Sequence, residues 1–237
     1  SEVFDDFDDW QPQLLGDASI GHNRYSTTGS SNSRKNIQPF LVNYHSGNLA
    51  VAHNGNLTND RKLRKWLEKE GSIFQTTSDT EVILHLIAKS QQTNQVDQVV
   101  EALNYLEGAF SLVILTDKYL IAARDKFGFR PLCIGKLGNS YVVASETCAF
   151  DIISAQYLRD VEPGEVVIIP LGSSDTEPFS RALSGKNGER KQCIFEYIYF
   201  SRPDSMIFGH NVDKIRRRLG KILAKRYPVI PKNPEEK

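Results

Sequence analysis

The sequence has few of the features that mark secreted, membrane or nucleic-acid-binding proteins. It contains only three cysteines in 237 residues, with no C-x-x-C pair, which argues against a disulfide framework and is typical of a reducing compartment. No apolar run comes near the roughly 20 residues of a membrane helix, and the N-terminus is acidic where a signal peptide is basic. The 29 basic and 29 acidic side chains balance, so the net charge does not favour nucleic acid or an anionic membrane. These absences predict a soluble, cytoplasmic protein.

Hydrophobic periodicity predicts a mixed α and β fold. Apolar residues make up 40% of the chain, which is enough for a buried core. Helical spacing is expected over about 60–70 and 96–106, and in a helix between them that Ser78 and Glu81 would begin as a capping box. Apolar runs between turn residues predict strands at 110–116, 119–124, 131–136, 141–145 and 165–169. This pattern by itself gives an α+β fold, with residues 171–190 as an exposed loop.

Three short polar clusters stand out from this pattern, at 21–29 (GHNRYSTTG), 53–56 (HNGN) and 77–81 (TSDTE). Arg24 in the first cluster provides a guanidinium that can bind an α-carboxylate through two hydrogen bonds. Asp79 in the third cluster can hold an α-ammonium group. The Asn54 amide and the Gly55 N–H can receive the oxyanion of a tetrahedral intermediate. The set suits a free amino acid with a reacting side-chain amide, and it still needs a nucleophile.

Each of these residues also has a simpler interpretation. An isolated arginine such as Arg24 is more often a surface or ion-paired residue. Asn54-Gly55 is a strong signal for a type I′ hairpin turn, although a tight turn would also present the amide and the next N–H in one direction. Asp79 fits equally well as an acid that the dipole favours at a helix N-terminus. The prediction of a site therefore depends on the three clusters together.

The three clusters in this order, followed by Glu-Tyr-Ile-Tyr-Phe-Ser-Arg-Pro-Asp-Ser at 196–205, closely resemble the glutamine phosphoribosylpyrophosphate amidotransferases, or amidophosphoribosyltransferases. The resemblance covers nearly the whole chain. It implies an incomplete four-layer αββα sandwich of the N-terminal-nucleophile hydrolase type over 1–205, which is a glutaminase domain. It implies the start of a phosphoribosyltransferase α/β domain at 206–237. By the same resemblance, Asn54 and Gly55 form the oxyanion hole, and Arg24, Thr27 and Asp79 bind glutamine.

Members of this family catalyse the opening step of purine synthesis, in which ammonia from glutamine reacts with phosphoribosyl pyrophosphate to give 5-phosphoribosylamine, glutamate and pyrophosphate. The resemblance implies a nucleophilic N-terminal Cys whose own α-amine acts as the base, and no such Cys is present here. We therefore expect the chain to be a piece of the enzyme, truncated at both ends and inactive by itself. Ser1 is a poor substitute nucleophile, because no apolar neighbours would seat it on a central strand.

Two other functions fit the same residues. One is a glutamine-binding or regulatory module that carries out no chemistry. The other is a different glutamine-dependent amidotransferase, such as glucosamine-phosphate synthase, which shares the Arg, Asn-Gly and Asp positions. Tyr25 and the Tyr-Phe-Ser-Arg-Pro-Asp-Ser segment at 199–205 favour the purine enzyme.

Cofactors are expected mainly outside this chain. Cys193 matches, by resemblance, the first ligand of a 4Fe-4S cluster in some family members, but a cluster needs four thiolates as a rule. Mg²⁺ would accompany phosphoribosyl pyrophosphate in the missing domain. We expect no cofactor in the chain itself, glutamine as its ligand, and a homo-oligomer when the protein is intact. Cys133 and Cys148 are expected to be buried small hydrophobes, and the segment around 215–223 an amphipathic basic helix.

Overall fold

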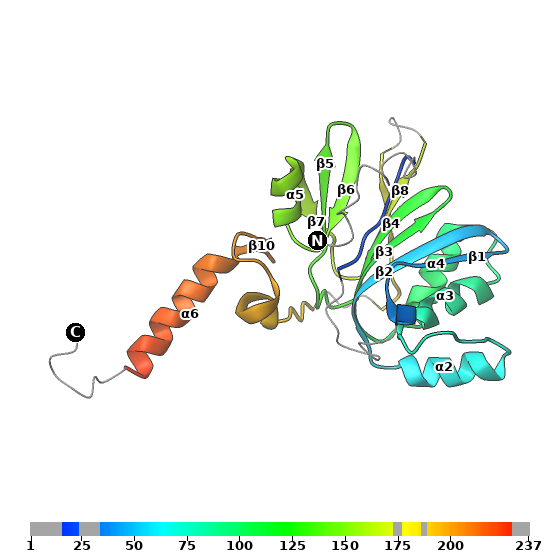
Figure 1. Cartoon of the computed structure of the whole chain (residues 1–237), viewed down its shortest axis with the longest axis horizontal. Helices are drawn as coiled ribbons and strands as arrows, with labels where there is room; N and C mark the ends of the chain where they lie inside the picture. The colour runs from blue at the N-terminus through cyan, green and yellow to red at the C-terminus, as the bar shows by residue number, and fades with distance from the viewer. Residues whose placement is uncertain (1–15, 24–33, 173–176, 186–188, 229–237) are drawn as a thin grey trace.

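The computed structural model describes residues 16–23, 34–172, 177–185 and 189–228, and it places them in two antiparallel sheets flanked by helices (Figure 1). The larger sheet has six strands in the order β1-β2-β3-β4-β8-β9. These strands are β1 (Phe40–Tyr44), β2 (Gly47–Leu57), β3 (Gly108–Thr116), β4 (Tyr119–Arg124), β8 (Glu165–Pro170) and β9 (Phe179–Ala182). The smaller sheet, in the order β6-β5-β7, consists of β5 (Cys133–Leu137), β6 (Ser140–Ala144) and β7 (Gln156–Asp160).

Two apolar cores separate the layers. The larger core lies between the six-stranded sheet and the helices α2 (Asp60–Lys69), α3 (Thr80–Lys89) and α4 (Gln95–Asn104). The second core lies between the two sheets, where Leu120 of β4 and Val167 of β8 pack with Ile134 of β5. Helix α5 (Cys148–Ile153) lies against β6 and β7 on the outer side of the smaller sheet (Figure 1). The layers therefore run helix, sheet, sheet, helix, which confirms the predicted α+β class and the αββα arrangement.

The alternation of side chains along β2 decides which layer each of its residues faces. Leu49, Val51 and Leu57 are buried in the helix-side core, so the odd-numbered residues of β2 face the helices. The even-numbered residues face the second sheet, and Asn54 is among them. In the ladder with β3, Asn54 lies opposite Ser111 and Gly55 lies opposite Phe110. Neighbouring residues of one strand thus reach two different layers.

The C-terminal part of the described chain forms a small unit beside the sandwich (Figure 1). It contains a π-helix, η4 (Glu196–Phe200), the short strands β10 (Met206–Ile207) and β11 (His210–Asn211), and the helix α6 (Val212–Arg226). Tyr197, Ile207 and Val212 form its apolar core. Helix α6 confirms the predicted basic helix, and most of its residues are exposed. None of the helices in the described residues is long and apolar enough to cross a membrane.

The predicted turn at Asn54-Gly55 is wrong. Both residues lie within β2, because this strand extends beyond its pairing with β1 and continues along β3 as far as Gly108. Strand β2 had no clear alternating pattern in its second half, because His53, Asn54 and Gly55, which line the site, interrupt the apolar residues. The predicted loop over 171–190 is also partly wrong, because β9 within it pairs with β8 at the edge of the sheet.

The predicted capping box is wrong as well. The N-cap residue of α3 is Asp79, not Ser78, and its side chain makes no capping bond. The Glu81 carboxylate instead accepts hydrogen bonds from the backbone N–H groups of Gln75 and Thr76, at 2.7 and 2.8 Å. Glu81 therefore holds the loop that leads into the helix, and the first turn of the helix leaves Asp79 available for contacts with β2.

Candidate active site

A cavity of about 610 Å³ opens beside β2 where its pairing with β1 ends. The last pair of that ladder joins Phe40 to Val51, and in the described part of the chain β2 continues with β3 alone. Asn54, Gly55 and Asp79 all line the cavity, so the structure brings together three of the predicted site residues. Arg24 and Thr27 lie outside the described residues, although Asn23, the residue directly before Arg24, also lines the cavity.

The open edge of β2 turns every second backbone N–H toward the cavity side. The N–H of His53 donates to Gln38 Oε1 at 2.7 Å, and the N–H of Leu57 donates to Asp79 Oδ2 at 2.9 Å. The N–H of Thr58, one residue out of step, turns the other way and donates to the carbonyl of Glu107. Because backbone direction alternates along a strand, the N–H of Gly55 lies on the open edge between those of His53 and Leu57. This is the donor direction that an oxyanion at the edge of β2 requires.

Asp79 reaches this edge from the helix layer. It is 5% exposed, and its position before the first turn of α3 places the carboxylate in the favourable field of the helix N-terminus. One of its oxygens receives the Leu57 N–H, and a carboxylate has lone pairs for further donors. Asn54 reaches the same cavity from the side of the second sheet, since even-numbered residues of β2 face that way. A ligand on the open edge would therefore meet the carboxylate on one side and the amide on the other.

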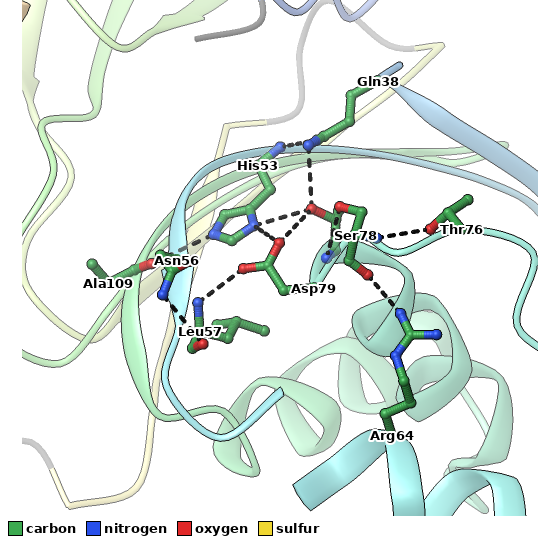
Figure 2. Close-up of polar contacts among 10 residues, drawn as sticks. Gln38, His53, Asn56, Leu57, Arg64, Thr76, Ser78, Asp79 and Ala109 are labelled. Atoms are coloured by element: carbon green, nitrogen blue, oxygen red, sulfur yellow. Dashed lines mark hydrogen bonds and ion pairs between the residues drawn. The ribbon is translucent and has the colours of Figure 1, made fainter. Parts of the chain in front are cut away.

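Figure 2 shows the polar network beneath this edge, centred on His53. His53 Nε2 lies 3.4 Å from the carbonyl oxygen of Ala109, which can only accept, so this nitrogen carries the proton. Nδ1 is then the acceptor for the hydroxyl of Thr80, at 3.1 Å. Burial lowers the pKa of His53 and outweighs the opposite effect of Asp79, whose nearest oxygen is 3.8 Å from Nδ1. The imidazole is therefore neutral and acts as a fixed support beneath Asp79 and Gly55.

An ion pair forms another part of the cavity wall. Arg130, in the turn before β5, donates from Nη1 to Glu196 Oε1 at 2.8 Å, and both side chains are largely buried. The guanidinium carbon of Arg130 also lies 4.4 Å from the ring centroid of Phe200. These residues of η4 line the cavity together with Arg130. The C-terminal unit thus contributes directly to the wall of the candidate site.

Cys148 also lines the cavity, but its environment does not activate the thiol. It is 6% exposed, and burial raises its pKa. Its sulfur lies 3.8 Å from Glu146 Oε2, and a negative neighbour disfavours the thiolate further. Cys148 therefore has the character of a buried structural cysteine, as Cys133 does inside β5.

Sequence reasoning missed several residues that shape the cavity. His53 and Thr80 stood in the second and third clusters without an assigned role, and Gln38 lies outside all three clusters. Arg130 lies in the connection between β4 and β5 and was assigned no role in the site, although a charged residue near the glycine turn at Gly128 is a usable signal. The part that Glu196 plays in the cavity wall can be seen only in the folded chain, because Glu196 is 66 positions away from its partner Arg130.

Cys193 lies apart from this cavity lining. It is partly exposed, and its backbone N–H donates to the carbonyl of Phe129 at 3.1 Å. Within the described residues there is no group of three or more His, Cys, Asp or Glu side chains suited to a metal ion. Cys193 can therefore supply one thiolate, and its ligation of a cluster remains a prediction.

The sequence matches a known family over the residues that build this cavity. Residues 22–151 match the family described as "Glutamine amidotransferase domain". An amidophosphoribosyltransferase of Vigna aconitifolia is 52% identical over 218 residues, which are 92% of this chain and 44% of that protein. The amidophosphoribosyltransferase of Bacillus subtilis is 50% identical over 218 residues, again 92% of this chain and 44% of that protein.

The fold agrees with a solved structure of this group. The glutamine phosphoribosylpyrophosphate amidotransferase of B. subtilis, complexed with ADP and GMP, matches with a TM-score of 0.80 and 48% identity over 88% of this chain and 44% of that chain. The chain spans less than half the length of the curated relatives named above. The family match includes Asn54, Gly55 and Asp79. The chain therefore belongs to the glutamine amidotransferase domain family.

Proposed function

We propose that this chain is the glutamine-binding part of the glutaminase domain of an amidophosphoribosyltransferase. The whole protein would release ammonia from glutamine and transfer it to phosphoribosyl pyrophosphate, giving 5-phosphoribosylamine, glutamate and pyrophosphate. The observation that carries the proposal is the meeting of Asn54, Gly55 and Asp79 on the open edge of β2. The names of the relatives support this reaction over that of glucosamine-phosphate synthase.

Each residue would act on a different part of glutamine. Asp79 would hold the α-ammonium, because it is a buried carboxylate at the cavity with acceptor capacity left. The Asn54 amide and the Gly55 N–H would stabilise the oxyanion that forms when the side-chain amide is attacked. Arg24 and Thr27 would bind the α-carboxylate side of the substrate, as the family resemblance implies. His53 stays neutral and supports this edge without exchanging a proton with substrate.

The attacking group is the part of the reaction that the described residues do not supply. The three cysteines of the chain are at 133, 148 and 193, and the one that lines the cavity, Cys148, has its pKa raised by burial. We therefore propose that the 237-residue chain binds glutamine without turning it over. A glutamine-binding module that carries out no chemistry is the alternative, and the relatives, which are named as amidophosphoribosyltransferases, do not favour it.

The intact protein would also need a second substrate and bound metal. We propose that the protein works in the cytoplasm as a homo-oligomer and uses phosphoribosyl pyrophosphate as its second substrate. Mg²⁺ would accompany phosphoribosyl pyrophosphate in the part of the protein outside this chain, and a 4Fe-4S cluster would take most of its ligands from there as well. Mg²⁺ would neutralise the charge of the pyrophosphate group, and Cys193 would supply one ligand to a cluster.

Calorimetry of the 237-residue chain tests the binding part. We expect L-glutamine to bind, D-glutamine to bind more weakly, and Asp79→Asn to reduce the affinity. Asp151→Asn is the matched control, because this acid lies exposed on α5 and outside the cavity lining. If Asp79→Asn and Asp151→Asn bind L-glutamine as the unsubstituted chain does, Asp79 is not a ligand residue.

A chimera tests the catalytic part. The segment of the B. subtilis amidophosphoribosyltransferase that aligns with this chain would be replaced by the 218 matching residues, which are 50% identical. We expect glutamine-dependent formation of 5-phosphoribosylamine in that chimera. A chimera that uses free ammonia but not glutamine, while the chain still binds glutamine, would support the binding module instead.

A further inference from the structure

Arg130 is fixed at both its main chain and its side chain. Its carbonyl oxygen accepts hydrogen bonds from Arg124 Nε at 2.8 Å and from Ser111 Oγ at 3.3 Å. Its guanidinium pairs with Glu196 at 2.8 Å and lies against the ring of Phe200. The main chain of Arg130 is thus attached to the six-stranded sheet, and its side chain is attached to η4.

The hydrogen bond from Ser111 to Arg130 lies beside Asn54, the candidate oxyanion donor. Ser111 and Asn54 are directly opposite each other in the β2–β3 ladder, so their side chains lie on the same face of the sheet. Ser111 is 3% exposed, and its hydroxyl is directed to the carbonyl of Arg130. A shift of Arg130 would therefore change the packing next to the Asn54 amide.

Glu196 attaches the other end of this chain of contacts to residues 193–205, which we call the connector. Its second oxygen accepts from Ser201 Oγ at 2.7 Å. The connector is also held by Glu146, whose Oε2 accepts from the N–H of Arg202 at 2.8 Å and from Ser205 Oγ at 2.7 Å. The Arg130–Glu196 pair links the connector to the turn before β5, where the carbonyl of Arg130 is bonded to Ser111 of β3.

We propose that Arg130 is a positioning residue that makes the orientation of the Asn54 amide depend on docking of the connector. The inference rests on the proposed function, in which Asn54 stabilises the oxyanion. Because both side chains are largely buried, a movement of the connector that separated them would leave each charge desolvated and without its opposite charge, so the intact pair is strongly favoured. A signal that moves the connector would thereby reach the oxyanion donor through Glu196, Arg130 and Ser111 in turn.

Nuclear magnetic resonance of the 237-residue chain tests the link directly. The side-chain amide signal of Asn54 is identified by its loss in Asn54→Ala. We expect Glu196→Gln and Arg130→Met each to shift or broaden that signal, and the double variant to have no larger effect than either single one. Arg202→Gln is the matched control, because it breaks the exposed Arg202–Asp204 pair in the same connector without touching Arg130.

Folding is followed by thermal melting, and Glu196→Asp is the second variant if Glu196→Gln does not fold. It keeps the charge but shortens the side chain, so the bond to Arg130 is lost while the connector keeps a carboxylate. An Asn54 signal that is unchanged in all folded variants, or changed equally by Arg202→Gln, would overturn the proposal.

Kinetics of the chimera provide the functional readout. We expect Glu196→Gln to lower kcat for glutamine by roughly 2- to 30-fold, the range of couplings through packed side chains, with KM for glutamine unchanged. A purely structural role would lower the melting temperature without this separation of kcat from KM. If the unsubstituted chimera does not use glutamine at all, the proposed function fails, whereas the Asn54 signal still reports on the link.

Discussion

His53 and Gly55 lie two residues apart on the same side of β2, and the imidazole leaves no room for a side chain at Gly55. A Cβ built on Gly55 would lie 2.8 Å from His53 Nε2 and 2.0 Å from the carbonyl oxygen of Ala109. The backbone of Gly55 also has a φ of +155°, which side chains rarely adopt. The close approach of β2 to β3 at this point thus requires a glycine next to the candidate oxyanion donor.

Replacing Gly55 with alanine should therefore destabilise the fold. We expect Gly55→Ala to lower the free energy of unfolding by about 1–3 kcal/mol, because the added methyl group must displace backbone atoms. Gly220→Ala is the control, since a Cβ there meets open space on α6 and alanine is the better helix former. Urea unfolding of both variants measures the difference. Equal stability of Gly55→Ala and the unsubstituted chain would show that β2 and β3 can separate at this point.

Burial of His53 should make stability depend on pH in the weakly acidic range. The pKa of His53 is lower in the folded chain than its usual 6.5, because burial disfavours the imidazolium form. Below pH 6.5 the unfolded chain therefore binds a proton that the folded chain does not, and stability falls as the pH drops. We expect a loss of up to about 1.4 kcal/mol per pH unit from this residue between pH 6.5 and 5.

The variant His53→Gln separates this effect from other titrations. The pKa of His85 is also lowered by burial, but this side chain is only partly buried, so His85→Gln should flatten the pH dependence less. Unfolding by urea at several pH values between 5 and 7 gives the slopes. A slope that is the same in His53→Gln and in the unsubstituted chain would mean that His53 is already protonated when folded.

The helices and most strands were predictable because their apolar periodicity is set by one buried face. Helix α2 spans Asp60–Lys69 against a prediction of about 60–70, and β3 and β4 agree with their apolar runs. Strand β2 was not predictable in this way. Its second half carries His53, Asn54 and Gly55, whose side chains or backbone face the cavity, so the alternation of apolar and polar residues is lost where the site begins.

The site was predictable as a set of residue types but not as a geometry. Asn54 and Asp79 were selected for their chemistry, and the structure places both at the cavity. The orientation of the site groups depends on the folded structure. Strand alternation directs the Gly55 N–H, and the Leu57 N–H holds the Asp79 carboxylate. Contacts across long sequence separations, such as Arg130 with Glu196, leave no local pattern in a single sequence.

The cysteines should differ in their reactivity toward an alkylating reagent. Burial raises the pKa of both Cys133 and Cys148, so we expect both to react slowly in the folded chain at pH 8. Cys193 is partly exposed and should be modified first. Mass spectrometry after timed iodoacetamide treatment identifies the modified residue, and Cys193→Ala should remove the fast phase. Rapid modification of Cys148 instead would identify it as an activated thiol in the cavity.

Loss of the Asp79 charge should weaken glutamine binding in the active chimera. Asp79→Asn keeps an oxygen that can accept the Leu57 N–H, so the fold should be largely preserved. A hydrogen bond to a charged group contributes about 1.5–3 kcal/mol, so KM for glutamine should rise by about 10- to 150-fold while kcat changes little. Activity with free ammonia serves as the control and should be retained. A fall in both activities together would indicate a structural role for Asp79.

Loss of the Asn54 amide should have the opposite kinetic signature. The amide meets developing negative charge only when the carbonyl of glutamine becomes an oxyanion, so its contribution appears in the transition state and not in substrate binding. We expect Asn54→Ala in the chimera to lower kcat for glutamine by about 10²–10³-fold, or about 2.7–4 kcal/mol, with KM nearly unchanged. Asn56→Ala is the matched control, because this residue lies on the same face of β2 but is exposed and outside the cavity lining. If Asn54→Ala raises KM at constant kcat, or if Asn56→Ala has the same effect, the amide of Asn54 does not stabilise the oxyanion.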